Sequence, residues 1–90
     1  MMTEYFNIGS IVKATYGRET GEIFIITKKT GDYVYLTNGK SRPLENPKKK
    51  NVKHIYLLNK DILKDIDLTN LTNAHIIKYL KDYNKSKDYK

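Results

Sequence analysis

The segment from Ile8 to Ile26 limits the possible folds more than any other part of this chain. Two runs rich in apolar and β-branched residues, 8–15 and 22–28, stand on either side of a loop bracketed by Gly17 and Gly21. This pattern is typical of two antiparallel strands joined through a glycine-dependent turn. Glycine has no Cβ, so it adopts positive φ readily and leaves main-chain groups accessible at a loop tip. The sequence predicts a strand-loop-strand unit whose tip is either a plain tight turn or a phosphate-binding loop.

The segment 33–37 predicts a third strand. Tyr33 and Tyr35 alternate with Val34 and Leu36, so one face of this strand should be core and the other available. A type I′ turn is expected next at Asn38-Gly39, because these two residue types tolerate the positive φ angles that this turn requires.

Two more strands should complete the sheet. A short strand at 40–42 would follow the turn and end at Pro43, which cannot donate to a ladder. The segment 44–51 contains Asn46-Pro47 and a triple lysine, so it predicts a basic loop, and 52–57 predicts the last strand. Five short strands at close spacing indicate a mostly β fold, a small five-stranded SH3-like barrel. The alternation of residues along the last strand does not show which of its two faces is buried.

The period of the apolar residues changes to a helical one after Leu58. Asn59 and Thr72 are plausible helix caps. The pattern predicts a short helix including Ile62, Leu63 and Ile66, a link at 68–71, and a helix near 73–83 with its apolar face at Ala74, Ile76, Ile77, Leu80 and Tyr83. Residues 84–90 are polar and predict disorder. We therefore expect a barrel at 1–58 and a helical extension at 59–90 that packs on it, although the helices could instead dock on a partner.

The length and the chemistry-bearing residues argue against an enzyme. Ninety residues allow one domain with a compact single core and no separate cofactor lobe. His54 and His75 are the only histidines, and the chain has no cysteine and no spaced set of carboxylate ligands. No catalytic constellation stands out. We expect a non-catalytic protein without cofactor or metal.

The net charge of +7 is concentrated in one segment. Residues 41–60 hold six basic residues and one acidic residue. A dense basic patch on a small domain favours a polyanionic partner, because each lysine that meets a phosphate releases condensed counterions. A solvated basic face without a partner is the alternative.

The chain reads as a soluble cytoplasmic protein. It has no cysteine for disulfides, and its N-terminus carries an acid where a signal peptide has basic residues. The longest apolar runs, 23–26 and 55–58, are too short to span a bilayer. We expect no contact with membranes.

Several motifs together resemble a known family. They are Gly9 followed by Ile11-Val12, the two loop glycines, the apolar run 23–26, and the segments 33–36, 38–43 and 45–55. This combination resembles the KOW motif, and more narrowly a small bacterial KOW-domain RNA-binding family related to large-subunit ribosomal proteins. The resemblance covers residues 8–58. It implies a small barrel that binds structured RNA, ribosomal RNA above all.

The candidate RNA-binding residues follow from the loop, the basic segment and the interleaved rings. Basic side chains supply affinity for the phosphate backbone, and aromatic side chains stack on unpaired nucleotides. The expected contacts are Lys13, Tyr16, Gly17, Arg18, Gly21, Lys28, Lys29, Arg42, Lys48, Lys49, Lys50, Lys53 and His54. Tyr33, Tyr35 and Tyr56 also follow basic residues, although tyrosine is in any case a favoured strand residue. The alternative function is a protein-interaction module, associated with ribosomes or transcription, that uses the barrel or the C-terminal helices.

Overall fold

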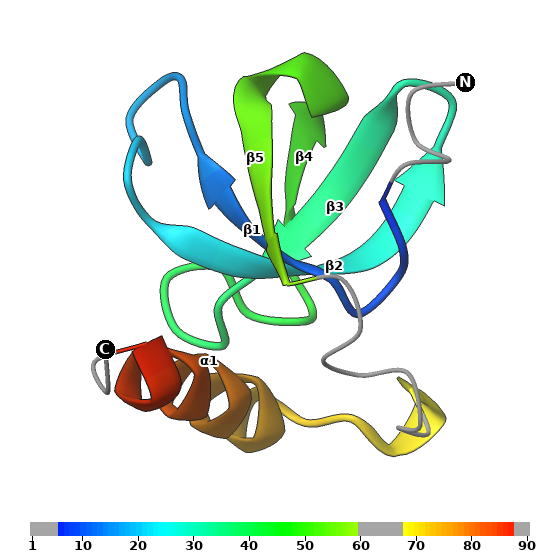
Figure 1. Ribbon diagram of the computed structural model, residues 1–90. Helices are drawn as coiled ribbons and strands as arrows, with labels where there is room; N and C mark the ends of the chain where they lie inside the picture. Colours follow the sequence, from blue (N-terminus) through cyan, green and yellow to red (C-terminus); the bar gives the residue numbers. More distant parts are fainter. Residues whose placement is uncertain (1–5, 60–67, 88–90) are drawn as a thin grey trace.

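The structure, a computed structural model, describes residues 6–59 and 68–87. Its strands are β1 (Ile11–Ala14), β2 (Ile23–Thr30), β3 (Tyr33–Thr37), β4 (Lys48–Asn51) and β5 (Ile55–Asn59). They form one antiparallel sheet in the order β4-β3-β2-β1-β5. The edge strands β4 and β5 are joined by a single 3-10 turn, Val52–His54, so the sheet must curl until its edges approach (Figure 1). The expected mostly β, barrel-like fold with a C-terminal helix is confirmed.

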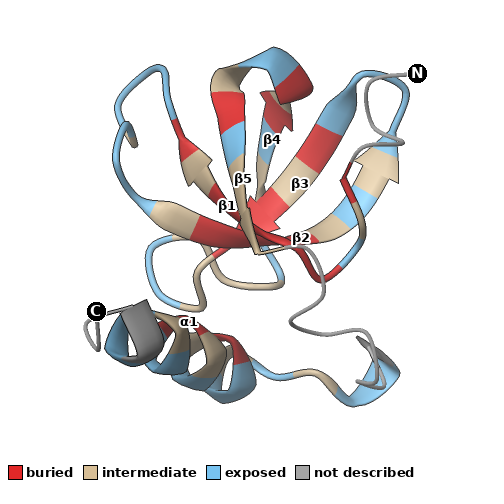
Figure 2. Cartoon of the chain, in the orientation of Figure 1, coloured by how far each residue is buried: buried red, intermediate tan, exposed pale blue. Residues whose placement is uncertain are grey.

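The sheet separates two apolar clusters, where the sequence predicted a single core. Val12, Phe24 and Ile26 point into the curled sheet, together with Phe6, Ala14, Val34, Leu36, Val52 and Ile55. Ile11 and Ile25 point to the other side, where they pack against the helix α1 (Asn73–Lys87). Buried residues accordingly lie along the sheet and on the side of α1 that faces it (Figure 2). Because both faces of β2 are covered here, Phe24, Ile25 and Ile26 are all buried despite the alternation of a strand.

The helix α1 begins at a cap that the sequence indicated. The Thr72 hydroxyl accepts a hydrogen bond from the His75 amide at 3.2 Å, and the Thr72 amide donates to His75 Nδ1 at 3.2 Å. This reciprocal pair has the form of a capping box with histidine in the usual place of glutamate. The Asn73 side chain then accepts from the Leu44 amide at 2.8 Å and donates to Glu45 at 3.1 Å. The first turn of α1 is thereby fixed to the segment that follows the 38–42 loop.

The predicted fourth strand and its turn are wrong. Residues 40–42 form no strand, and Asn38 does not have the positive φ of a type I′ turn. Instead the Asn38 side-chain oxygen accepts from the amides of Lys40 and Arg42, each at 2.9 Å. Such side-chain capping of backbone amides is the usual competitor of a regular hairpin turn. The pairing partner of β3 is the lysine run, which the sequence predicted to be a loop.

The predicted last strand is partly wrong. The 3-10 turn takes up Val52–His54, so the strand starts at Ile55. The turn breaks the alternation of buried and exposed residues that a continuous strand would have. As a result, Val52 and Ile55 are both buried, although they are three residues apart, and Tyr56 is exposed.

The C-terminal predictions differ in their outcomes. Residues 84–87, predicted to be disordered, continue α1, whereas 88–90 and the predicted helix around Ile62 to Ile66 lie outside the described residues. A 3-10 turn, Leu68–Asn70, occupies the predicted link.

Candidate nucleic-acid interface

Two lysines and two tyrosines form a ladder on the outer face of β2, β3 and β4. Tyr35 on the central strand pairs with Lys28 on one side and with Lys49 on the other. Directly paired residues of antiparallel strands share a face. Lys28 Nζ lies 5.3 Å from the centroid of the Tyr35 ring, and Lys49 Nζ lies 4.7 Å from that of Tyr33. We call Lys28, Tyr33, Tyr35 and Lys49 the outer ladder.

A bulge in β2 decides that Lys28 belongs to this face. Ile26 pairs with Leu36 and points inward, but the register shifts before Lys28. Thr27 is the extra residue, and its hydroxyl donates to the Tyr35 carbonyl at 3.4 Å. Without the bulge, Lys28 would oppose Val34 and point into the barrel. Bulges commonly re-aim a side chain in this way.

The neighbouring lysines 29 and 50 face inward instead, because both pair with Val34. Lys29 Nζ donates to the Phe6 carbonyl at 2.9 Å. Lys50 is only 8% exposed and donates to the Tyr16 carbonyl at 2.9 Å. Its ammonium also lies 3.5 Å from Glu19 Oε1. The sequence placed Lys50 in a basic loop and among the RNA contacts, whereas the structure buries its side chain against the glycine loop.

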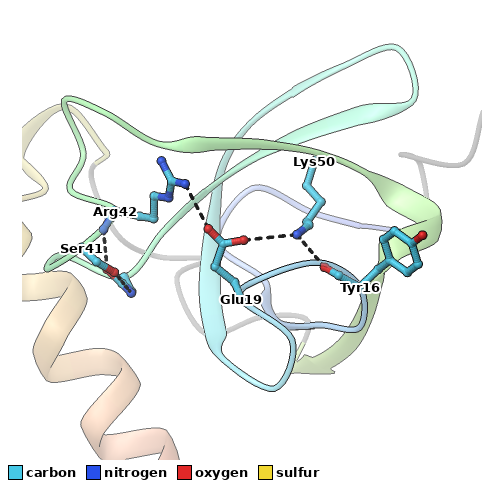
Figure 3. A network of polar contacts seen from close by, with 6 residues as sticks. Tyr16, Glu19, Ser41, Arg42 and Lys50 are labelled. Atoms are coloured by element: carbon cyan, nitrogen blue, oxygen red, sulfur yellow. Dashed lines mark hydrogen bonds and ion pairs between the residues drawn. The ribbon is translucent and has the colours of Figure 1, made fainter.

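Glu19 joins Lys50 to Arg42 (Figure 3). We call Arg42, Glu19, Lys50 and the Tyr16 carbonyl the internal network. Arg42 Nη2 donates to Glu19 Oε2 at 3.0 Å, between residues 23 apart in the sequence. This hydrogen bond is the main reason that the pKa of Glu19 is lowered, and the positive charges of Lys48 and Lys50 add to it against the opposing effect of burial. Two cations that the sequence assigned to the basic surface thus have an internal anionic partner.

The glycine loop has the backbone that the sequence predicted. Gly17 and Gly21 have φ angles of +90° and +93°. The loop is closed by Gly21, whose amide donates to the Ala14 carbonyl at 2.8 Å. A Cβ on Gly17 would lie 3.4 Å from Lys50 Nζ, an ordinary contact distance, so the positive φ rather than the neighbouring ammonium favours glycine at this position.

Tyr16 and His54 form a second aromatic group, between the glycine loop and the 3-10 turn. Their ring centroids are 4.7 Å apart and their planes differ by 22°. Tyr16 is 66% exposed, so one side of this stack is open to solvent. The Thr15 amide donates to the His54 carbonyl at 2.9 Å and fixes the two segments together. Arg18 and Lys53, both exposed, belong to these same two segments.

The remaining predicted residues lie apart from these groups. Lys13 pairs with Tyr56, which is 62% exposed, on the β1–β5 side of the sheet. Lys48 pairs with Leu36, a core residue. The structure therefore divides part of the predicted set among the outer ladder, the Tyr16–His54 stack and the internal network, and leaves Lys13, Lys29 and Lys48 outside all three. Sequence reasoning missed Glu19, for which only its place between the two loop glycines gave a signal.

Other kinds of site find little support in the described ranges. Within residues 6–59 and 68–87, no group of three or more His, Asp or Glu side chains could hold a metal ion. No helix in that part of the chain is long and apolar enough to cross a membrane. Comparison of the chain with models of known protein families and with the curated proteins found no match in either case.

Proposed function

We propose that this protein is a non-catalytic RNA-binding protein whose contact surface is the outer ladder. The observation that carries the proposal is the alternation of ammonium groups and partly exposed rings across three neighbouring strands. Ammonium groups supply affinity for phosphates without reading base identity, and rings supply stacking. The resemblance to KOW-domain proteins adds support, and it suggests ribosomal RNA or the ribosome as the partner and the cytoplasm as the compartment.

The internal network reduces the number of basic side chains that are available to bind RNA. Lys50 and Arg42 already contact Glu19, and Lys50 is buried. Moving a buried, hydrogen-bonded ammonium to an external phosphate would leave the Tyr16 carbonyl and Glu19 without a donor, at a cost of about 1–3 kcal/mol. Lys28 and Lys49 are exposed and meet only tyrosine rings among the contacts described above. Electrostatic binding should therefore depend on these two more than on Lys50.

The alternative function, docking of a protein through the C-terminal helix, has less support. Ile76 is fully buried and Leu80 nearly so, and both pack against Ile11 and Ile25 of the chain's own sheet. The apolar side of α1 is thus already used within the molecule. The outer ladder, by contrast, is basic and offers no comparable apolar surface.

The salt dependence of RNA affinity tests the proposal. We expect wild-type protein to bind a structured RNA with unpaired loops, with an affinity that falls steeply with salt. Lys28→Ala/Lys49→Ala should reduce the slope of log affinity against log salt by about 1.4, taking 0.7 for each single-strand phosphate contact. A matched control, Lys78→Ala/Lys85→Ala, removes the same charge from exposed positions on α1. Equal losses in both double variants, or the absence of binding to any RNA, would contradict the proposal.

A further inference from the structure

We infer that the outer ladder binds an unpaired strand of RNA, with neighbouring nucleotides stacked on Tyr33 and Tyr35 and their phosphates held by Lys28 and Lys49. The inference rests on the proposed function and specifies its ligand. It distinguishes a stacking surface, which needs accessible bases, from a merely basic surface, which would bind a duplex as well.

The spacing of the two rings favours a single strand. Tyr33 and Tyr35 are two residues apart on β3 and share a face. Residues so placed are separated by about 7 Å, at 3.3–3.4 Å per residue of strand. Successive bases on one strand of a duplex are stacked directly on one another, about 3.4 Å apart along the axis in DNA, so their faces are covered by their neighbours in an RNA duplex as well. Two bases can each lie on a separate ring only if the strand is unpaired and splayed, as is usual when proteins read single-stranded RNA.

The exposure of the rings is compatible with stacking. Tyr33 is 41% exposed and Tyr35 is partly exposed, while Val34 between them is fully buried. The rings are therefore anchored by a strand whose other face belongs to the core. A base that stacks on such a ring meets a surface that is already ordered, so little conformational entropy is lost on binding.

The lysines cover the rings in the free protein and must move when a base arrives. Lys49 Nζ is 4.7 Å and Lys28 Nζ 5.3 Å from the ring centroids. An exposed cation–π contact of this kind is weak. A base can therefore replace the ammonium on the ring, and the displaced ammonium, on a flexible four-carbon stem, can reach the phosphate of the same nucleotide. The ladder thus brings both kinds of contact to one strand.

The test compares an unpaired probe with a paired one. The probes are a labelled oligouridine of about ten nucleotides, within the usual size of single-strand sites, and an RNA duplex of the same length. We expect wild-type protein to prefer the oligouridine. Tyr33→Leu and Tyr35→Leu should each weaken oligouridine binding by about 5- to 150-fold, the range for loss of one base–aromatic stack, and change duplex binding little. Tyr33→Phe and Tyr35→Phe should retain binding because they keep the ring.

Tyr56→Leu is the matched control, since Tyr56 is an exposed strand tyrosine beside Lys13 rather than beside the ladder. It should leave both affinities unchanged. If the duplex binds as tightly as oligouridine and the leucine variants at Tyr33 and Tyr35 behave as wild type, the inference is wrong while RNA binding itself survives. If neither probe nor a structured RNA binds, the proposed function is wrong as well.

Discussion

At Gly39 the chain has no room for a side chain. Its φ angle is +80°, and a Cβ would lie 2.6 Å from the Asn73 carbonyl oxygen in the first turn of α1. We expect Gly39→Ala to lower the free energy of unfolding by about 2–4 kcal/mol, through backbone strain of about 1–3 kcal/mol and displacement of the helix. Gly21→Ala is the control, because Gly21 has a similar φ of +93° and nothing within 4 Å of the added Cβ. Urea unfolding of both variants should show the larger loss at Gly39, and equal losses would mean that the close approach to α1 is unimportant.

Glu19 should make the stability of the protein depend on pH. Its pKa is lowered, first by the hydrogen bond from Arg42, so the folded state favours the carboxylate. The stabilisation should be fully present above the ordinary value of 4.5 and should disappear as the pH falls through the lowered folded value. Glu19→Gln should cost about 1–3 kcal/mol at neutral pH, the usual cost of losing a charged hydrogen-bond partner. The difference between wild type and variant, measured by urea unfolding, should shrink in acid; a constant difference would contradict this assignment.

The sequence predicted correctly those features that depend on the local backbone and side-chain chemistry of a single residue. The positive φ angles at Gly17 and Gly21 and the cap at Thr72 follow from local chemistry. The partners of Lys50 do not, because Tyr16 and Glu19 approach it only after the sheet has curled. A lysine in a polar run is expected to be exposed. Only the register of β4 shows that Lys49 lies on the outer face of the sheet and Lys50 on the inner face.

The element whose packing is most open to test is α1. Ile76 is fully buried against the sheet, so Ile76→Ala should lower the free energy of unfolding by about 2–4 kcal/mol, the usual cost of truncating a buried aliphatic side chain. Lys85→Ala, at an exposed position on the same helix, should change it by less than about 0.5 kcal/mol. Thermal or urea unfolding decides the matter. A negligible effect of Ile76→Ala would mean that α1 does not stabilise the sheet in solution.

The elements were predicted unevenly for a physical reason. β2 begins with a continuous apolar run, β3 and α1 carry apolar periodicity, and the sequence located each of them. β4 carries none: three of its four residues are lysine, and its place in the sheet comes from pairing with β3. The 3-10 turn after it was also missed, because it changes the parity of burial within an apparently continuous strand. Tertiary pairing, rather than local propensity, formed β4, whereas the Asn51 side chain caps the 3-10 turn by accepting from the Lys53 amide.

On the scale of the whole molecule, the outer face of the sheet has two parts. α1 covers the part that includes Ile11 and Ile25, and the outer ladder lies on the part formed by the far end of β2 with β3 and β4. The helix thus completes the apolar packing on one part and leaves the cationic and aromatic one accessible. The sequence indicated a basic, tyrosine-rich surface, but the division between internal and external lysines required the register of the sheet.

A nuclear magnetic resonance titration of the isotopically labelled protein with unpaired RNA tests directly whether the outer ladder binds RNA. We expect the largest chemical-shift changes at Lys28, Tyr33, Tyr35 and Lys49, including the ring resonances of the two tyrosines. Residues of α1, such as Ile76 and Lys85, should change little. Shift changes concentrated on α1, or a spectrum unaltered by RNA, would contradict the claim that the outer ladder is an RNA-binding surface.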